Sequence, residues 1–383
     1  MISLRFHQLL KESFLFVSYG TMLLFLLYSD AWLGGNPGVL LEGALLLWLF
    51  GVMLLSSFAV VRHAEVLAEE LGEPCGTLIL TLTVTGIEVI MIAALMFKGN
   101  NPTLARDTMF SVVMILLGGI LGGCLLIGGF RFREQNFNLK GEKSFMGLIL
   151  PLSLFALVLP NFTIGGAGFF SPLHATIIGL LSLTLYAIFL VVQTYWHREF
   201  FMETALFDNS EEELEYSLMP YSPQKRAWSL ILSHTLFLLF YLPPILILSK
   251  KMALLLNFKN QGNTLFFSEP THSAINGLIV AILILAPEGM AALRAAWNNQ
   301  MQRSVNLLLG SVLATISLTV PAVLGLGLFI GQPIHLGLDP AGITLLAVTL
   351  GSCLITFSQG QTNLLQGAIH LFLFVVYILL MFE

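Results

Sequence analysis

Apolar runs of about 20 residues recur from one end of the chain to the other, separated by short polar breaks. Reading between the breaks gives runs at 14–33, 38–62, 76–97, 108–130, 146–162, 172–196, 228–249, 274–296, 304–331, 341–357 and 365–382. A helix needs about 20 consecutive apolar residues to cross a bilayer. The pattern predicts an all-α polytopic membrane protein with about 11 transmembrane helices.

Composition supports this prediction. Of 383 residues, 56% are hydrophobic and 10% are charged, whereas soluble domains carry roughly 25% charged residues. The surface must therefore face lipid, and the bilayer is the main partner. The net charge of −5 is spread over 17 basic and 22 acidic residues in the connecting loops, which indicates no nucleic-acid partner. Homo-oligomerisation is left open.

The distribution of basic residues predicts the orientation. With the N-terminus in the cytoplasm, twelve of the 17 Lys and Arg residues fall on the cytoplasmic side, as the positive-inside rule requires. We therefore expect a cytoplasmic N-terminus and a periplasmic C-terminus. Segment 1–36 is interpreted as an N-terminal transmembrane helix, because further spans follow at once; a cleaved signal peptide is the alternative.

The longest non-apolar stretch, 197–225, contains the acidic run EEELE at 211–215. It predicts a first five-helix repeat at 37–197, an acidic cytoplasmic linker at 198–227 and a second five-helix repeat at 228–383. We interpret the linker as a solvated loop, because a run of acids cannot pack; attraction of cations is the alternative role.

Two glutamates occupy equivalent places in the predicted halves. Glu88 and Glu288 each lie in the second span of their half, and a serine follows each after 23 positions, at Ser111 and Ser311. With five spans in each half, the second copy must enter the membrane from the opposite side. The sequence thus predicts two inverted five-helix repeats plus the extra N-terminal helix, an arrangement common in secondary transporters.

A carboxylate within a membrane span costs roughly 2.5–3.5 kcal/mol, so it usually faces a cavity or a partner. The alternative is that each glutamate ends its span and reaches interfacial water, but both lie well inside their apolar runs. Proline at 287 and glycine at 86 weaken the helix beside each acid and free carbonyl oxygens. The candidate ligands of a transported cation are therefore Glu88 and Glu288, supported by Thr83, Thr85, Gly86, Ser111, Pro287 and Ser311.

Carboxylates and freed carbonyls are the ligands that a hard cation such as Ca²⁺ prefers. Burial and mutual repulsion favour the protonated form of two neighbouring carboxyls, so protons compete with the cation for the same oxygens. A site that holds either a cation or protons, and does not cross empty, exchanges one for the other.

Several motifs carry a resemblance to a known family. They are LGEPCGTLIL at 71–80 leading to Glu88, PTLARDT at 102–108, PEG at 287–289, NNQ at 298–300 and NLLLGSVLATISLTVP at 306–321. The chain resembles, over nearly its whole length, the calcium/cation antiporter superfamily, and in its cation/proton exchanger branch the bacterial ChaA-type sodium-potassium/calcium-proton antiporters.

The resemblance implies eleven spans, one glutamate from each half in a central site, an acidic linker and a bacterial inner-membrane location. It implies secondary active export of calcium, and of sodium or potassium, in exchange for protons by alternating access, with no cofactor. The family's usual Gly-Asn before each acid is replaced here by Val84-Thr85 and Ile284-Leu285, and a Gln by Ala314. These departures favour the alternative, a sodium/proton or potassium/proton antiporter with little calcium transport.

Other features receive no role in transport. His63 and the acids of 62–74 are expected on a solvated helix face, and His174, His234 and His370 are expected to be hydrogen-bonded interior side chains. Glycines at 118–119 and 122–123 favour close helix packing. The three cysteines show no zinc spacing. Two alternatives remain. A membrane-embedded enzyme is disfavoured because HExxH, GxSxG and an intramembrane aspartate pair are absent from the sequence. A non-transporting scaffold or receptor would not need two acids at equivalent repeat positions.

Overall fold

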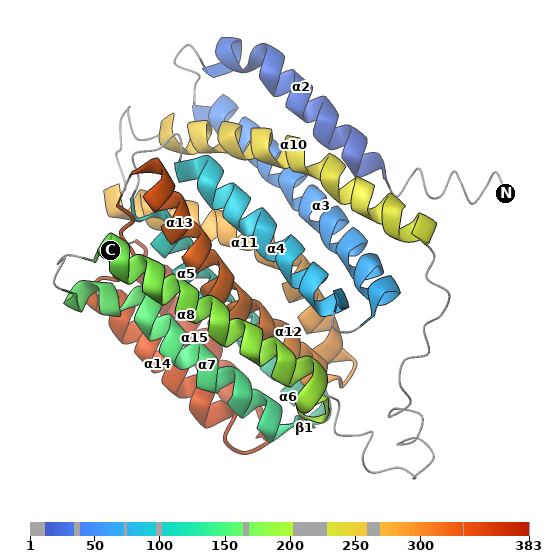
Figure 1. Cartoon of the computed structure of the whole chain (residues 1–383), viewed down its shortest axis with the longest axis vertical. Helices are drawn as coiled ribbons and strands as arrows, with labels where there is room; N and C mark the ends of the chain where they lie inside the picture. The colour runs from blue at the N-terminus through green and yellow to red at the C-terminus, as the bar shows by residue number, and fades with distance from the viewer. Residues whose placement is uncertain are drawn as a thin grey trace. The chain divides into compact units, whose positions relative to one another are not determined.

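The computed structural model describes residues 12–33, 39–72, 75–96, 102–163, 168–201, 228–258, 269–331 and 333–382, and this part of the chain is nearly all helical (Figure 1). The chain divides into two compact units. Unit 1 comprises Met1–Asn101 and Lys225–His272, and unit 2 comprises Pro102–Gln224 and Ser273–Glu383. Each unit draws on both of the predicted halves. Most of the predicted linker, 202–227, lies outside the described residues.

Unit 1 contains α2 (Ser13–Leu33), α3 (Val39–Leu71), α4 (Cys75–Met96) and α10 (Trp228–Phe258). Helix α10 packs against the other three. Polar contacts join the helices within their apolar faces: the Ser18 and Ser56 hydroxyls lie 2.7 Å apart, and Lys251 Nζ donates to Ser29 Oγ over 2.7 Å.

Helix α3 continues nine residues past the predicted end of its span at 62. Residues 62–71, which the sequence analysis expects on a solvated helix face, are thus the last turns of α3. For His63 that expectation is wrong, because only 1% of the side chain is exposed. The reason is that this turn of α3 packs against α10, where His234 and Phe237 cover the imidazole.

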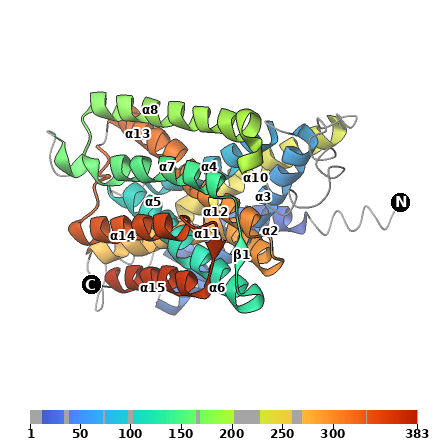
Figure 2. The ribbon, with the colours of Figure 1, turned by 90° about the horizontal axis from the view of Figure 1, so that it is seen from below.

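Unit 2 holds the remaining elements. They are α5 (Leu104–Met114), η1 (Ile115–Ile120), α6 (Leu121–Phe132), β1 (Gln135–Asn136), α7 (Leu139–Leu157), η2 (Leu159–Phe162), α8 (Pro172–Val191), η3 (Val192–Trp196), η4 (Arg198–Phe201), α11 (Glu269–Trp297), α12 (Met301–Ala314), η6 (Thr315–Thr319), α13 (Val320–Ile330), α14 (Pro340–Thr356), β2 (Gln361–Thr362) and α15 (Leu364–Leu380). Figure 2 shows α8 lying along α13, and α14 beside α15.

Six helical segments in the described part of the chain are long and apolar enough to cross a membrane. They are Leu40–Leu71, Leu104–Phe132, Pro172–Trp196, Trp228–Met252, Ala274–Trp297 and Met301–Ile330. Four shorter apolar helices accompany them, at Ser13–Ser29, Ile79–Ala94, Pro340–Thr356 and Leu364–Leu380. The prediction of a predominantly helical chain with several membrane-length helices is confirmed.

Polar side chains cap the N-termini of several helices of unit 2. Asn138 accepts from the Lys140 backbone N–H at the start of α7, and Asp339 accepts from Gly342 N–H at the start of α14. Asn363 and Gln366 form a reciprocal capping box at the start of α15. Each cap satisfies backbone donors that have no partner in the first turn, which fixes where the helix begins.

Helices α6 and α15 pack backbone to backbone. A Cβ added at Gly122 would lie 2.8 Å from Leu371 N, and one added at Gly367 would lie 2.7 Å from Leu126 N. Only glycine leaves room for such an approach. The expectation of close packing is therefore confirmed at Gly122.

Two short extended contacts join the loops of unit 2. Strands β1 and β2 pair antiparallel, with Gln135 opposite Thr362, and Phe169 forms an isolated antiparallel bridge with His335. The first contact links the α6–α7 connection to the α14–α15 connection. The second links the α7–α8 connection to the α13–α14 connection.

Candidate functional site

Glu288 lies on α11, directly after Pro287. The Ser311 hydroxyl on α12 donates a short hydrogen bond to Glu288 Oε2. This contact joins the two residues that the sequence pairs by their 23-position spacing. Proline cannot donate a backbone hydrogen bond, so the Leu283 carbonyl one turn earlier lacks its usual helical donor. A carboxylate, a hydroxyl and a main-chain carbonyl are therefore grouped along neighbouring turns of α11 and α12.

A tight contact fixes α11 at this point. A Cβ added at Gly289 would lie 2.5 Å from Ile120 Cδ1 of η1. Glycine directly after the acid thus lets η1 approach the backbone of α11 beside Glu288. A larger side chain at 289 would force the Ile120 side chain to move away from α11.

A π-helical turn follows each of the two serines, and neither turn was predicted from the sequence. Segment η1 begins at Ile115 and η6 begins at Thr315, each four residues after its serine. The Ile115 N–H contacts the Ser111 and Val112 carbonyls, and the Thr315 N–H contacts the carbonyls of Ser311 and Val312 in the same way. Such π-bulges often occur at functional sites, because the wider turn leaves carbonyls poorly paired.

Glu88 lies on α4 in unit 1, and only 1% of it is exposed. Thr85 is buried and Thr83 is partly buried on the same helix. A Cβ added at Gly86 would meet no atom within 4 Å, so the glycine leaves open space beside the turn that carries the acid. The polar groups expected around Glu88 within α4 are thus present and largely shielded from solvent.

Ser111 belongs to unit 2 and is fully buried. Its hydroxyl donates to the Asp107 carbonyl over 2.7 Å and lies 2.6 Å from the Tyr377 hydroxyl. The hydroxyl therefore joins α5 to α15. Its repeat-mate Ser311 instead donates to a carboxylate, so the two serines differ in their partners.

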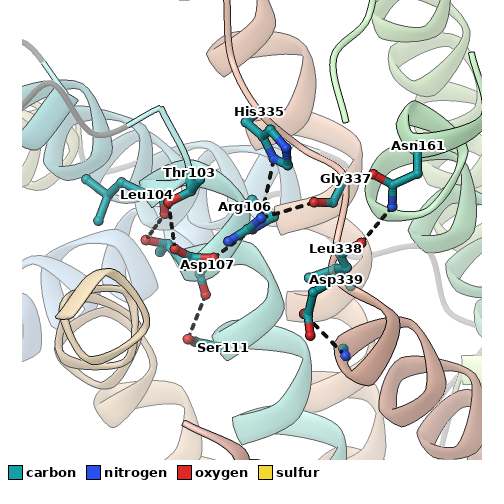
Figure 3. Close-up of polar contacts among 12 residues, drawn as sticks. Thr103, Leu104, Arg106, Asp107, Ser111, Asn161, His335, Gly337, Leu338 and Asp339 are labelled. Atoms are coloured by element: carbon teal, nitrogen blue, oxygen red, sulfur yellow. Dashed lines mark hydrogen bonds and ion pairs between the residues drawn. The ribbon is translucent and has the colours of Figure 1, made fainter. Parts of the chain in front are cut away.

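A charged cluster lies at the start of α5 (Figure 3). Arg106 Nε donates to Asp107 Oδ1 over 2.7 Å, and Arg106 Nη1 donates to the Gly337 carbonyl over 3.1 Å. Thr103 Oγ1 donates to Asp107 Oδ2 over 3.0 Å. Arg106 Nη1 also lies 3.3 Å from His335 Nδ1. The Arg106 guanidinium, held by Asp107, thus joins the start of α5 to the α13–α14 connection through the Gly337 carbonyl.

Asn161, in η2 directly after α7, contacts the same connection. Its Nδ2 donates to the Leu338 carbonyl over 2.6 Å (Figure 3). The Leu338 N–H donates in turn to the Leu157 carbonyl over 2.8 Å. The residues before α14 are therefore held from two sides, which positions the cap at Asp339.

A second buried acid, which the sequence analysis missed, lies at the start of α7. Glu142 is fully buried, and its Oε1 accepts from Gln302 Nε2 over 2.9 Å. Gln302 Oε1 accepts from the Asn138 backbone N–H over 2.5 Å. Glu142 precedes the apolar run that starts at 146, and burial raises its pKa to about 8, against the hydrogen bond from Gln302, which lowers it. From the sequence, only acids that lie inside a predicted apolar run are selected, and Glu142 lies four residues before the run that starts at 146.

Within the described residues, no group of three or more His, Cys, Asp and Glu side chains could hold a metal ion.

The described part of the chain has six membrane-length apolar helices, a buried carboxyl at Glu88 on the apolar helix α4, and a carboxyl at Glu288 that is bonded to a hydroxyl beside a proline-weakened turn. These features are typical of the class of integral membrane transport proteins. Comparisons with known proteins agree. The family model described as sodium/calcium exchanger protein matches residues 41–195 and 270–383.

Relatives and solved structures point the same way. Sodium-potassium/proton antiporter ChaA of Escherichia coli (strain K12) is 40% identical over 338 residues, which cover 88% of each chain. Ca(2+)/H(+) antiporter ChaA of Bacillus subtilis (strain 168) is 24% identical over 275 residues, covering 69% of this chain and 73% of that protein. The structure of native YfkE superposes with a TM-score of 0.66 at 18% identity, covering 96% of this chain and 99% of the other. The crystal structure of H+/Ca2+ exchanger CAX superposes with a TM-score of 0.65 at 17% identity, covering 96% of this chain and 88% of the other. Both likenesses establish the fold.

The chain belongs to the sodium/calcium exchanger family. It is an integral membrane protein of a family of ion exchangers, so the membrane-embedded enzyme considered above is set aside.

Proposed function

We propose that this protein is a secondary active antiporter that exports cations in exchange for protons by alternating access, with Glu88 and Glu288 sharing one central site. The observation that carries the proposal is the contact between Ser311 and Glu288, a carboxylate held by a hydroxyl on membrane-length helices. Buried carboxylates in a membrane span are expensive, and binding a cation or a proton removes that cost. Either ligand therefore stabilises the site, and the empty, doubly charged site does not cross.

The cation is proposed to be sodium or potassium, together with calcium. The 40% identical relative is named a sodium-potassium/proton antiporter, and the 24% identical relative a Ca(2+)/H(+) antiporter. Thr85, Leu285 and Ala314 stand where the family's pattern has Asn, Asn and Gln, so amide oxygens are missing from the proposed site. This favours ions that need fewer strong ligands than calcium does. Exchange of sodium or potassium with little calcium transport remains the second candidate.

An inverted repeat is part of the proposal. Exchanging α5–α8 with α12–α15 places η1 on η6, and Ser111 on Ser311, 200 positions apart. The same exchange converts the β1–β2 contact into the Phe169–His335 bridge, because each joins corresponding connections. This correspondence supports two copies of one five-helix repeat, at 37–197 and 228–383, separated by the linker at 198–227. With the N-terminal helix at 1–36, the proposal has eleven spans.

We place the protein in a bacterial inner membrane, with a cytoplasmic N-terminus and a periplasmic C-terminus. The support is the distribution of basic residues, twelve of 17 on the proposed cytoplasmic side. Fusing a reporter that is active only in the periplasm to each end tests the orientation. Both ends in one compartment would require an even number of spans and would contradict the inverted repeat.

Proton flux in everted vesicles tests the activity. Vesicles from cells with and without the protein are energised, and sodium, potassium or calcium is added in turn while the internal pH is followed. The proposal expects cation-dependent loss of the proton gradient only when the protein is present. Loss of the gradient without added cation would indicate a leak, and no response to any of the three cations would contradict antiport.

A further inference from the structure

Three polar side chains of unit 1 form a cluster that is separate from the acids proposed to bind cations. It runs from Glu12, just before α2, to His63 on α3 and His234 on α10. His63 Nε2 lies 3.1 Å from Glu12 Oε2, and His63 Nδ1 lies 2.8 Å from His234 Nδ1. Arg62 Nη2 donates to the other carboxylate oxygen of Glu12 over 2.8 Å. Both ring nitrogens of His63 are thus occupied.

Contact between two Nδ1 atoms restricts the protons on both rings. One of the two nitrogens must carry the hydrogen and the other must accept it. If His63 donates Nε2–H to Glu12 and is neutral, its Nδ1 accepts and His234 donates from Nδ1. If His63 carries hydrogen on both nitrogens, it is a cation beside the Glu12 carboxylate and His234 Nδ1 accepts. The same geometry fits both states.

The cluster is shielded on one side and reaches solvent on the other. Phe237 of α10 stacks on His63 at 4.8 Å with an interplanar angle of 12°, and the fully buried Tyr241 lies 6.1 Å from it between ring centres. The side chains of Glu12 and Arg62 are 17% and 34% exposed, against 1% for His63. Protons can therefore enter from the Glu12 end.

Charged and titratable groups of the neighbouring elements act on the cluster. The α2 side supplies Glu12, α3 supplies Arg62 and Glu70, and α10 supplies His234 and Tyr241. Helix α4, which packs on α3 and α10, carries Glu88 as its one charged residue. Glu12 stabilises a positive charge on His63, and Arg62 opposes it.

We infer that Glu12, His63 and His234 form a second proton-binding site, in which one proton moves between the Glu12 carboxyl and His234. Starting from protonated Glu12 and neutral His63 that carries Nδ1–H, the Glu12 hydroxyl proton moves to His63 Nε2 and gives a carboxylate and an imidazolium. The Nδ1 proton of His63 then moves to His234 Nδ1. The second ring becomes the cation, His63 keeps Nε2–H, and the proton count is unchanged at each step.

The site would give transport a pH response of its own. An added proton turns one of the two rings into a cation, so the charge of the cluster depends on pH. Its charge acts where α2, α3 and α10 meet, on the unit that carries Glu88. This last step rests on the proposed antiport, whereas proton binding itself does not.

Solid-state NMR on the full chain in lipid, with the histidine rings labelled with ¹⁵N, tests proton sharing directly. At 2.8 Å, the two Nδ1 atoms should give a strong ¹⁵N–¹⁵N correlation, which is lost in His234→Gln. The matched control is His174→Gln, since the exposed His174 contacts only nearby Ser171 in the described structure. Persistence of the correlation in His234→Gln, or its absence from the wild type, would overturn the inference.

A titration of the same samples tests the coupling. His63 should ionise in two steps in the wild type, with a midpoint that moves by about one pH unit in Glu12→Gln and in His234→Gln, and stays fixed in His174→Gln. A midpoint that is the same in all four samples would overturn the relay. If a variant does not fold, the wild type alone tests the relay: two ionisation steps at His63 support it, and a single step overturns it.

In vesicles, His63→Gln should shift the pH at which exchange is half-maximal and leave the maximal rate near wild type. Wild-type vesicles without any exchange would contradict the proposed antiport, while the NMR result would still decide the proton site. An unchanged pH profile alongside wild-type exchange would overturn the regulatory part.

Discussion

Ser311 donates a hydrogen bond to Glu288 from the neighbouring helix, 23 residues further along the chain. The two residues belong to α12 and α11, and Pro287 stands directly before the acid. A hydroxyl donor stabilises the ionised carboxylate, which is the form that we propose binds the cation. Ser311 is therefore the residue most directly placed to set the balance between cation and proton at Glu288.

Ser311→Ala should weaken cation binding without abolishing exchange. A hydrogen bond to a charged group contributes about 1.5–3 kcal/mol, so the half-saturating cation concentration at neutral pH should rise about tenfold or more. Ser311→Thr keeps the hydroxyl and is the matched control. Vesicle assays over a range of sodium and calcium concentrations make the measurement, and wild-type half-saturation in Ser311→Ala would contradict a role in the site.

Apparent cation affinity should fall as the pH falls, because protons and cations occupy the same oxygens. The half-saturating concentration should change with a slope close to two protons for a divalent ion and close to one for a monovalent ion. Measurements from about pH 6 to 9 cover the range to which buried carboxyls are commonly shifted. Half-saturation independent of pH for every cation would mean that the protein is a channel or a uniporter.

Glu142 should make the folded protein less stable as the pH rises. Burial raises its pKa from 4.5 to about 8, so the folded state keeps a proton that the unfolded chain has released. Between these values the folded state binds more protons, and stability decreases with increasing pH. Glu142→Gln removes the titrating group and should flatten the fall in unfolding midpoint between about pH 5 and 8. The exposed Glu134→Gln is the control, and equal slopes in the wild type and Glu142→Gln would contradict the account.

Arg106→Gln should loosen the α13–α14 connection. The change removes the hydrogen bonds to Asp107 Oδ1 and the Gly337 carbonyl, at a cost of about 1–3 kcal/mol in unfolding free energy. The unfolding midpoint of the detergent-solubilised protein should fall. Arg303→Gln, at an exposed position in the first turn of α12, should leave it unchanged; equal midpoints for both variants would show that the ion pair contributes nothing.

Local patterns predicted the helices well. Helices α4 and α11 cover the apolar runs predicted at 76–97 and 274–296, because length and hydropathy suffice for a helix in lipid. The 23-position spacing picked out Glu288 and Ser311, which are in contact, but the same spacing did not predict the partners of Ser111, which are the Asp107 carbonyl and the Tyr377 hydroxyl.

Contacts between distant residues were not predictable. His63 and His234 lie 171 positions apart, and Glu142 and Gln302 lie 160 positions apart; each residue by itself has an ordinary local sequence. The π-helical turns after Ser111 and Ser311 depend on how neighbouring helices pack, so no local pattern distinguished them from ordinary α-helix. The division into two units likewise depends on contacts between segments from both halves.

We propose that Glu88 and Glu288 both carry the exchanged ions. Glu88→Gln and Glu288→Gln keep the size of each side chain and remove the titratable oxygen, and Glu134→Gln controls for loss of an exposed acid. All three variants are compared with the wild type in everted vesicles at matched amounts of inserted protein, with dissipation of the proton gradient followed on adding sodium, potassium or calcium. The account predicts no cation-dependent dissipation in Glu88→Gln and in Glu288→Gln, and wild-type dissipation in Glu134→Gln. Dissipation at the wild-type rate in either Glu88→Gln or Glu288→Gln would contradict it.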